Sequence, residues 1–243
     1  MDKPSYRFEF KYPISPNEIE CLESELKKFG MRPDSSTEAS GGSYWVASLY
    51  FDSYDFIDYQ EKSGGFLERK KIRARIYEPF LDKSEFVWLE LKKRHDAKIF
   101  KTRLKLNREE WKDLMERGTI ALAETRRDGE AEHARKEILR AVTVFSAKPK
   151  IVVRYRRKSL ISTSNAIRIT FDSGLEACRK GDLDYNGFMT AVNRGGAILE
   201  IKSVSALPQW LGDMIIRHDL KRDAFSKYAY AIEAVYQYNP LPR

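Results

Sequence analysis

The clearest chemical signal in this chain is a set of lysines and arginines that recur at every second position of predicted β-strands. The longest row is Arg69-Lys71-Arg73-Arg75, a second is Lys101-Arg103-Lys105, and Arg157 and Arg168 lie on two later segments. Residues two apart in a strand point to the same face of a sheet. Because like charges on one face repel each other, the pattern indicates a sheet whose basic face normally holds a polyanion.

Three of the strand-like segments also place a carboxylate two residues before a lysine. These pairs are Glu9-x-Lys11, Glu90-x-Lys92 and Glu200-x-Lys202. Cations bind phosphate oxygens, and oxygen ligands from carboxylates suit a divalent metal. The combination is therefore what a phosphate chain with a bound metal ion would need.

Alternating and helical patterns predict the elements that position these side chains. A capping box at Ser15 and Glu18 starts a helix that ends at Gly30, Asn107 caps a helical stretch over 109–145, and residues 35–42 form a loop. Further helical segments are expected at 54–59, from Pro208, and over 225–238. Strands are expected at 6–12, 44–52, 66–77, 86–94, 99–106, 150–158, 166–172 and 197–204.

About eight antiparallel strands with flanking helices predict an α+β fold, an antiparallel β-barrel that is closed or nearly closed. We expect one domain over residues 1–243, with a helical insertion at about 107–147. Two interpretations of the charged strand faces remain open. They can point to water, or they can line a tunnel while the apolar faces support outer helices. The set favours the tunnel, because a solvated face usually mixes charges of both signs.

The basic composition favours anionic partners but does not distinguish among them. The net charge of +8 and the pI near 9.3 favour anionic partners, which include nucleic acid, anionic lipid and phosphometabolites. No apolar run approaches the roughly 18 residues of a membrane span, and the first residues are not of signal-peptide type, so the cytoplasm is the expected compartment. The sequence contains no Walker A string and no kinase signature. It does not indicate an oligomeric state.

Several motifs also carry a family resemblance, in the same order over nearly the whole chain. They include Tyr6 to Tyr12, Ser48-Leu49-Tyr50-Phe51-Asp52, Arg69 to Tyr77, Leu199-Glu200-Ile201-Lys202 and Ser226-Lys227-Tyr228. Together they resemble the VTC domain, the catalytic domain of polyphosphate polymerases in the CYTH-like triphosphate tunnel metalloenzyme superfamily. The resemblance implies a basic, metal-dependent tunnel in which the γ-phosphate of ATP is transferred to a growing polyphosphate chain.

The resemblance also implies roles for individual residues. Glu200 is the best candidate to bind Mn²⁺ or Mg²⁺, and Glu9 and Glu90 are weaker candidates that could instead neutralise neighbouring cations. Arg103, Tyr155 and Ser226 are candidates for substrate binding, although Tyr155 could equally support the wall. The residues expected to contact phosphate in catalysis are Lys11, Arg73, Arg75, Lys92, Arg157, Arg168, Lys202 and Lys227.

The expected partners are ATP and polyphosphate or pyrophosphate. Nucleic acid is not expected, because a narrow tunnel cannot admit a duplex. Two alternatives to the polymerase remain: a tripolyphosphate or nucleoside-triphosphate hydrolase of the same superfamily, and a non-catalytic polyphosphate-binding subunit.

Overall fold

The computed structural model describes residues 8–95, 98–122, 129–164, 166–179, 181–192 and 196–237. The chain divides into two compact units, each treated by itself below. The first unit comprises Met1–Trp45, Tyr155–Glu176 and Ala191–Ser226, and the second comprises Val46–Arg154, Ala177–Thr190 and Lys227–Arg243. The expectation of a single domain stays a prediction.

The strands form one sheet with the hydrogen-bonded order β1-β10-β8-β7-β3-β4-β5-β6, in which β2 also pairs with β7 and β9 with β8. Every ladder with a described register is antiparallel. The bounds are β1 (Phe8–Ile14), β2 (Arg32–Pro33), β3 (Tyr44–Asp52), β4 (Glu68–Ile76), β5 (Val87–His95), β6 (Lys98–Leu106), β7 (Lys148–Ile161), β8 (Ile167–Cys178), β9 (Thr190–Ala191) and β10 (Ala197–Ser203).

The predicted α+β class, an antiparallel sheet with eight main strands and flanking helices, is confirmed. Within the described residues the path of ladders has two ends, at β1 and β6, so its hydrogen bonding is not that of a strictly closed barrel. The first predicted strand corresponds to β1, and residues 6 and 7 of that prediction lie outside the described part of the chain.

The predicted capping box at Ser15 and the predicted helix cap at Asn107 are both present, and the second is also a capping box. The Glu18 side chain accepts from the backbone N–H of Ser15 at 2.7 Å, and Asn107 and Glu110 bond each other reciprocally at 2.8 and 2.9 Å. The helical elements are η1 (Pro16–Glu18), α1 (Ile19–Lys28), α2 (Ser35–Ala39), α3 (Ile57–Ser63), η2 (Leu81–Lys83), α4 (Arg108–Arg117), α5 (Gly129–Val144), α6 (Gln209–Arg217) and α7 (Lys227–Tyr236).

The predicted loop at 35–42 is wrong in its first half, where the short helix α2 forms. Its N-cap is Asp34, whose carboxylate accepts a hydrogen bond of 2.9 Å from the backbone N–H of Thr37. The serines and threonine that made this segment look like a loop lie in the first turn of α2. The hydrogen bond to Asp34 stabilises that turn as a helix despite its polar composition.

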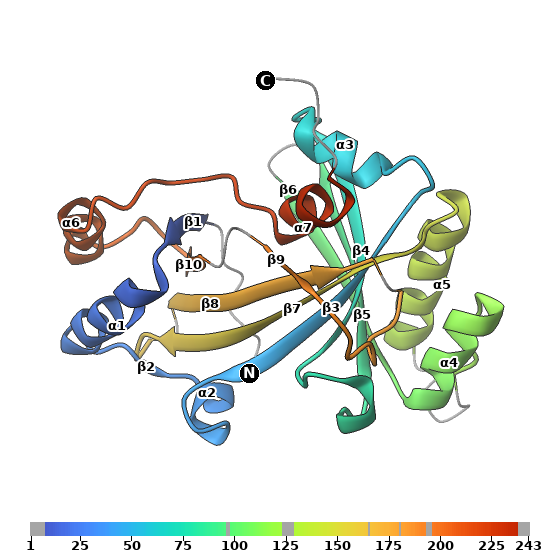
Figure 1. Cartoon of the computed structure of the whole chain (residues 1–243), viewed down its shortest axis with the longest axis horizontal. Coiled ribbons are helices and arrows are strands. Elements are labelled where there is room, and N and C mark those ends of the chain that lie inside the picture. The colour runs from blue at the N-terminus through green and yellow to red at the C-terminus, as the bar shows by residue number, and fades with distance from the viewer. Residues whose placement is uncertain are drawn as a thin grey trace. The chain divides into compact units, whose positions relative to one another are not determined.

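Each unit buries the apolar face of its strands against helices. Figure 1 locates these helices, which are α1 and α6 in the first unit and α4 and α5 in the second. In the first unit, Phe171 and Leu199 of the sheet lie in one core with Leu22 and Leu26 of α1 and with residues of α6. In the second unit the corresponding core joins the apolar side chains of β3 to β6 to α4 and α5. In both units the apolar strand faces support helices, as the alternation predicted, and the charged side chains occupy the opposite face.

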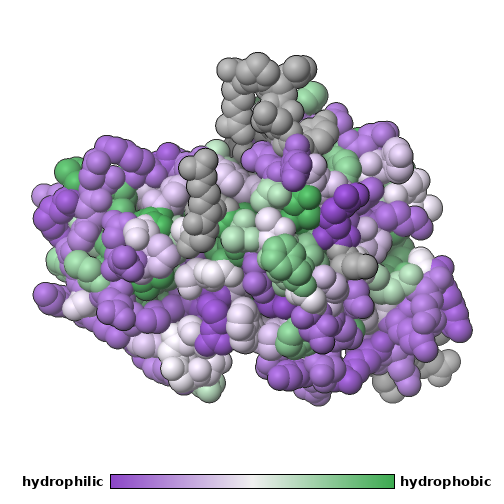
Figure 2. All heavy atoms as spheres, in the orientation of Figure 1, coloured by the Kyte–Doolittle hydropathy of each residue, from purple (hydrophilic) through white to green (hydrophobic). Residues whose placement is uncertain are grey.

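Hydrophilic residues cover much of the surface seen in Figure 2, and hydrophobic ones form smaller groups between them. Among the described residues, none of the helices has the length and apolar character required to span a bilayer. Cys21 is exposed and Cys178 is buried, and both are free thiols.

Candidate phosphate-binding faces

The second unit carries a basic face on β3 to β6, opposite the core that α4 and α5 cover. We define this face by three cross-strand rows. The rows contain seven cationic side chains and one carboxylate, an imbalance that a solvated surface would not be expected to keep. They are Ser48-Arg75-Trp88-Lys105, Tyr50-Arg73-Glu90-Arg103 and Lys71-Lys92-Lys101.

Glu90 is the single carboxylate of these rows, and its side chain is 2% exposed. Its oxygens lie 2.5 Å from Nε of Arg73, 2.8 Å from Nζ of Lys101 and 3.2 Å from Nε of Arg103. Burial by itself raises the pKa of Glu90, but the charges of Arg73, Arg75 and Lys101 outweigh it and hold this pKa well below its usual range. In this structure Glu90 is the counter-ion of a cation cluster, and its metal-binding role stays a prediction.

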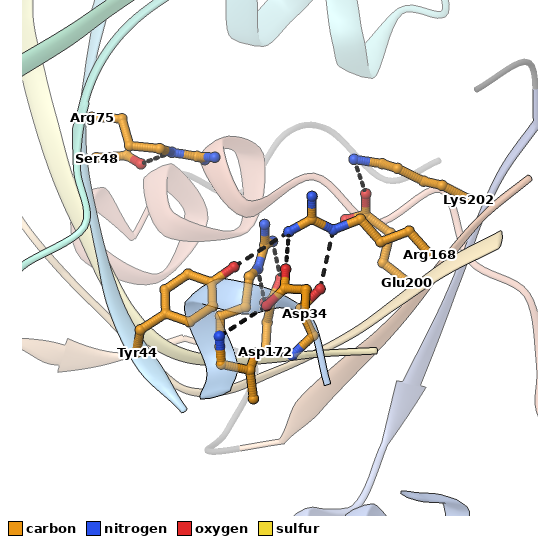
Figure 3. Close-up of polar contacts among 11 residues, drawn as sticks. Asp34, Tyr44, Ser48, Arg75, Arg168, Asp172, Glu200 and Lys202 are labelled. Atoms are coloured by element: carbon orange, nitrogen blue, oxygen red, sulfur yellow. Dashed lines mark hydrogen bonds and ion pairs between the residues drawn. The ribbon is translucent and has the colours of Figure 1, made fainter. Parts of the chain in front are cut away.

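Neutral groups also contact two arginines of the basic face, Arg75 and Arg103, of which Arg103 is in addition one of the three cations beside Glu90. The Nε–H of Arg75, a buried residue, donates to Oγ of Ser48 at 3.0 Å (Figure 3). The guanidinium of Arg103 stacks on the ring of Trp88, with 3.6 Å from Cζ to the ring centroid. A hydroxyl and an aromatic ring fix a direction without cancelling a charge, so these contacts preserve positive potential on the face.

Helix α7 is joined to the basic face by the tyrosine that follows Lys227. The hydroxyl of Tyr228 donates to Oδ2 of Asp52 at the end of β3, and its ring stacks on Tyr50 at 5.1 Å between centroids. The pKa of Tyr50 is raised by burial but lowered overall, because Arg73, Arg75 and Lys227 favour the phenolate. The charge of Lys227 therefore acts on Tyr50 of the central row, and its role in phosphate binding stays a prediction.

Asp52 also holds the start of α3, which the sequence placed three residues too early. One Asp52 oxygen accepts from the backbone N–H groups of Ser53 and Asp58, at 2.7 and 3.0 Å, and the other accepts from that of Tyr59 at 3.2 Å. A carboxylate that bonds several N–H groups of a first helical turn stabilises that turn. One residue thus anchors both α3 and α7.

Asp58, in the first turn of α3, should make stability depend on pH. Burial raises its pKa, the hydrogen bond from Lys70 lowers it, and the charge of Asp52 raises it again, to about 7 overall. Because the folded-state pKa lies above the ordinary aspartate value of 3.8, the folded state holds this proton more tightly than the unfolded chain. The associated stability is present at low pH and is lost as the pH rises through about 7.

We expect the unfolding free energy to decrease between pH 5.5 and pH 8.5, and we expect Asp58→Asn to flatten this decrease. Urea unfolding of both proteins at several pH values measures it. Asp219→Asn, on a side chain that is 80% exposed, is the matched control and should keep the wild-type slope. An Asp58→Asn protein with that same slope would contradict the assignment.

The first unit carries a mixed-charge face on β1, β10, β8 and β7. The antiparallel register places Lys11 opposite Glu200 and Glu9 opposite Lys202, so the two Glu-x-Lys pairs lie side by side with alternating charge. Within each pair Nζ contacts the carboxylate, at 2.9 Å for Lys11–Glu9 and 2.7 Å for Lys202–Glu200 (Figure 3). Glu9, like Glu90, is thus paired with a cation in this structure, and its metal-binding role stays a prediction.

Arg157 and Arg168 extend this face onto β7 and β8. Arg157 forms a two-pronged ion pair with the fully buried Asp172, with 2.6 Å from Nε to Oδ1 and 2.7 Å from Nη2 to Oδ2. Burial alone lowers the pKa of Arg157, but the charge of Asp172 outweighs it and raises that pKa well above the usual value. Nη2 of Arg168 donates to Oδ2 of Asp34 at 2.7 Å, and its Nε to Oγ of Ser159 at 3.1 Å (Figure 3).

The other two candidates for substrate binding, Tyr155 and Ser226, are both buried. Tyr155 is fully buried beneath the guanidinium of Arg157, with 5.4 Å from Cζ to the ring centroid. This favours wall support, one of the two roles that the sequence left open. Ser226 is buried directly before α7.

A divalent metal fits Glu200 only if other ligands come with it. The Glu200 side chain is 7% exposed and its Oε1 contacts Lys202. Within the described part of the chain, no group of three or more His, Cys, Asp or Glu side chains could hold a metal. Mg²⁺ and Mn²⁺ commonly take one or two carboxylates and complete their shell with substrate phosphates and water. The donor set therefore fits a metal ion that arrives with a nucleotide.

Sequence reasoning left several supporting residues without a role. Ser48 and Asp52 lie two residues to either side of Tyr50, and the period-two rule alone would have placed them on the charged face. Asp172 ends the predicted strand 166–172, but its partner Arg157 lies 15 residues away on another strand. Asp34 is 134 residues from Arg168, and no local pattern signals that contact.

Comparisons with known proteins agree with this architecture. Among similar solved structures, a candidate adenylate cyclase from Bacillus halodurans has a TM-score of 0.53 and 15% identity, covering 90% of this chain and 92% of that one. A candidate adenylyl cyclase from Hippeastrum with a dominant triphosphatase activity has a TM-score of 0.52 and 13% identity, covering 93% and 95%. At these identities the likeness shows a shared fold. No curated protein matches the sequence.

The family model described as the VTC domain matches residues 6–236, which is nearly the whole chain. That range contains both charged faces and the helix that begins at Lys227. The chain belongs to the VTC domain family.

Proposed function

We propose that this protein is an ATP-dependent polyphosphate polymerase, which transfers the γ-phosphate of ATP to the end of a polyphosphate chain. The observation that carries the proposal is the basic face of the second unit, with seven cations and one carboxylate in three rows. Such an excess suits a ligand with one negative charge or more on every phosphate. Membership of the VTC domain family supports the same substrate class.

Arginines and lysines have different tasks in this proposal. Arg73 and Arg75 would bind phosphate oxygens with planar guanidinium groups, which can engage two oxygens at once. Arg157 and Arg168 would do the same on the mixed-charge face, where Asp172 and Asp34 hold them in place. Lysines such as Lys92 and Lys227 would act as compact charges. Phosphoryl transfer depends mainly on alignment and on neutralising the transferring group.

The reaction needs no strong general base. The terminal phosphate of the chain is already an anionic nucleophile, and its oxygen attacks the γ-phosphorus of ATP. The bond from that phosphorus to the bridging oxygen breaks, and ADP leaves with the electron pair. A metal ion at Glu200, Mn²⁺ or Mg²⁺, would neutralise charge on the phosphates. ATP and polyphosphate or pyrophosphate are the proposed partners, and the cytoplasm is the proposed compartment.

A primer-extension assay tests the function directly. Purified protein with ATP, Mn²⁺ and pyrophosphate should produce long polyphosphate, which a gel resolves, together with ADP. Arg73→Ala should abolish most of this activity, because it removes a guanidinium from the central row. Lys93→Ala is the control, since Lys93 pairs with Glu137 on the helix-covered side of the same sheet at 2.6 Å.

Different products would support different activities. Inorganic phosphate without polymer would support the hydrolase alternative and overturn the polymerase. Tight polyphosphate binding without nucleotide turnover would instead support a non-catalytic binding subunit.

A further inference from the structure

One buried hydroxyl on the mixed-charge face has no hydrogen-bond partner in the described part of the chain. Thr170, in β8, is 4% exposed, and its Oγ1 is among the few buried side-chain atoms left unbonded there. Burying a hydroxyl without a partner costs free energy, whereas valine has nearly the same shape without that cost. Packing alone would favour valine here, so the hydroxyl of Thr170 is expected to have a role in binding.

The surroundings of Thr170 indicate what this reason is. Thr170 lies two residues from Arg168 and two from Asp172, so the three side chains share one face of β8. Its Cα partner across the ladder is Glu200 of β10. The hydroxyl of Ser159, by contrast, already accepts a hydrogen bond from Arg168. Thr170 is thus an unbonded donor between an arginine expected to bind phosphate and the carboxylate expected to bind metal.

We infer that the Thr170 hydroxyl donates a hydrogen bond to an anionic oxygen of the bound phosphate chain. The inference rests on the proposed function for the identity of this ligand. A hydroxyl has a proton to donate, and a phosphate oxygen beside Arg168 is an acceptor that the charges already attract. No covalent bond is made or broken by Thr170. It is a binding residue, one that costs stability while the ligand is absent.

The test exploits this opposition between stability and binding. Calorimetric titration with tripolyphosphate, in EDTA and then in Mn²⁺, should show about tenfold weaker binding or more for Thr170→Val, the range for a hydrogen bond to a charged group. Thr170→Ser, which keeps the hydroxyl, should bind nearly as the wild type. Without ligand, Thr170→Val should unfold at the wild-type temperature or above it, because it loses no internal hydrogen bond.

Thr102→Val is the matched control. Thr102 Oγ1 donates to Glu137 on the helix-covered side of β6, so its loss should lower the unfolding temperature and leave tripolyphosphate binding unchanged.

Three results would overturn the inference: wild-type binding by Thr170→Val, weaker binding in Mn²⁺ alone, or a lower unfolding temperature of the ligand-free variant. Weaker binding only when Mn²⁺ is present would mean that the Thr170 hydroxyl contacts a metal-bound water and not a phosphate oxygen. The titration needs no turnover, so a wild-type protein that makes no polymer refutes the proposed polymerase and leaves this inference standing.

Discussion

Glu200→Gln should lower the rate of metal-dependent phosphoryl transfer by about 100-fold or more, the scale on which one electrostatic group acts in an active site. The substitution keeps the shape of the side chain but removes the charge that would bind the metal. Steady-state polymer synthesis at saturating ATP, measured over a range of Mn²⁺ concentrations, gives both the rate and the metal dependence.

The same variant should retain tripolyphosphate binding in EDTA, and even bind more tightly, because a negative charge beside Lys202 is gone. Loss of this metal-free binding would indicate damage to the whole face. Glu9→Gln is the informative comparison, since Glu9 also pairs with a lysine but its side chain is 34% exposed, against 7% for Glu200. Equal metal dependence in wild type and Glu200→Gln would contradict the role of Glu200.

Glu90→Ala should destabilise the ligand-free protein by about 3 kcal/mol, near the low end for removing one partner of a buried ion pair. The smaller destabilisation is expected because the side chains of Arg73, Lys101 and Arg103 are between 26% and 48% exposed. Water therefore still solvates these cations when the carboxylate is removed. Denaturant unfolding of the variant and the wild type measures this difference.

Tripolyphosphate should restore part of the lost stability, because its oxygens can replace the missing carboxylate. The rise in unfolding temperature on adding tripolyphosphate should therefore be larger for Glu90→Ala than for the wild type. Glu132→Ala is the control, since Glu132 forms an ion pair with Arg135 on helix α5 and should change neither quantity appreciably. A destabilised Glu90→Ala protein with no added response to tripolyphosphate would show that the cations do not bind phosphate.

Local pattern was sufficient to predict the strands and their two faces. Arg73 and Ile72 are neighbours in β4, yet Ile72 is buried in the core and Arg73 lies on the opposite face, as alternation requires. The predicted end of the strand at residue 172 is wrong. Gly174 adopts a φ of +61° inside β8, so the strand continues to Cys178 and not to residue 172.

Contacts between distant segments were beyond local pattern. The antiparallel placement of Glu9-x-Lys11 against Glu200-x-Lys202 depends on the register of two strands far apart in the chain. The choice of Asp172 as the partner of Arg157 depends on how two strands align, and periodicity does not encode that alignment. Sequence therefore identified the cations, and the structure identified the groups that orient them.

The hydrogen bond between Tyr228 and Asp52 joins residues 176 positions apart, which has a consequence for biosynthesis. Strands β3 to β6 are complete once residue 106 has been made, and their pairings are between chain neighbours. Helix α7 follows much later, so a nascent chain presents these seven cations before Tyr228 has been synthesised. We therefore expect the Tyr50 ring and the Asp52 carboxylate to gain their contacts with Tyr228 only after α7 has been made, which places this joint among the last parts of the second unit to form during translation.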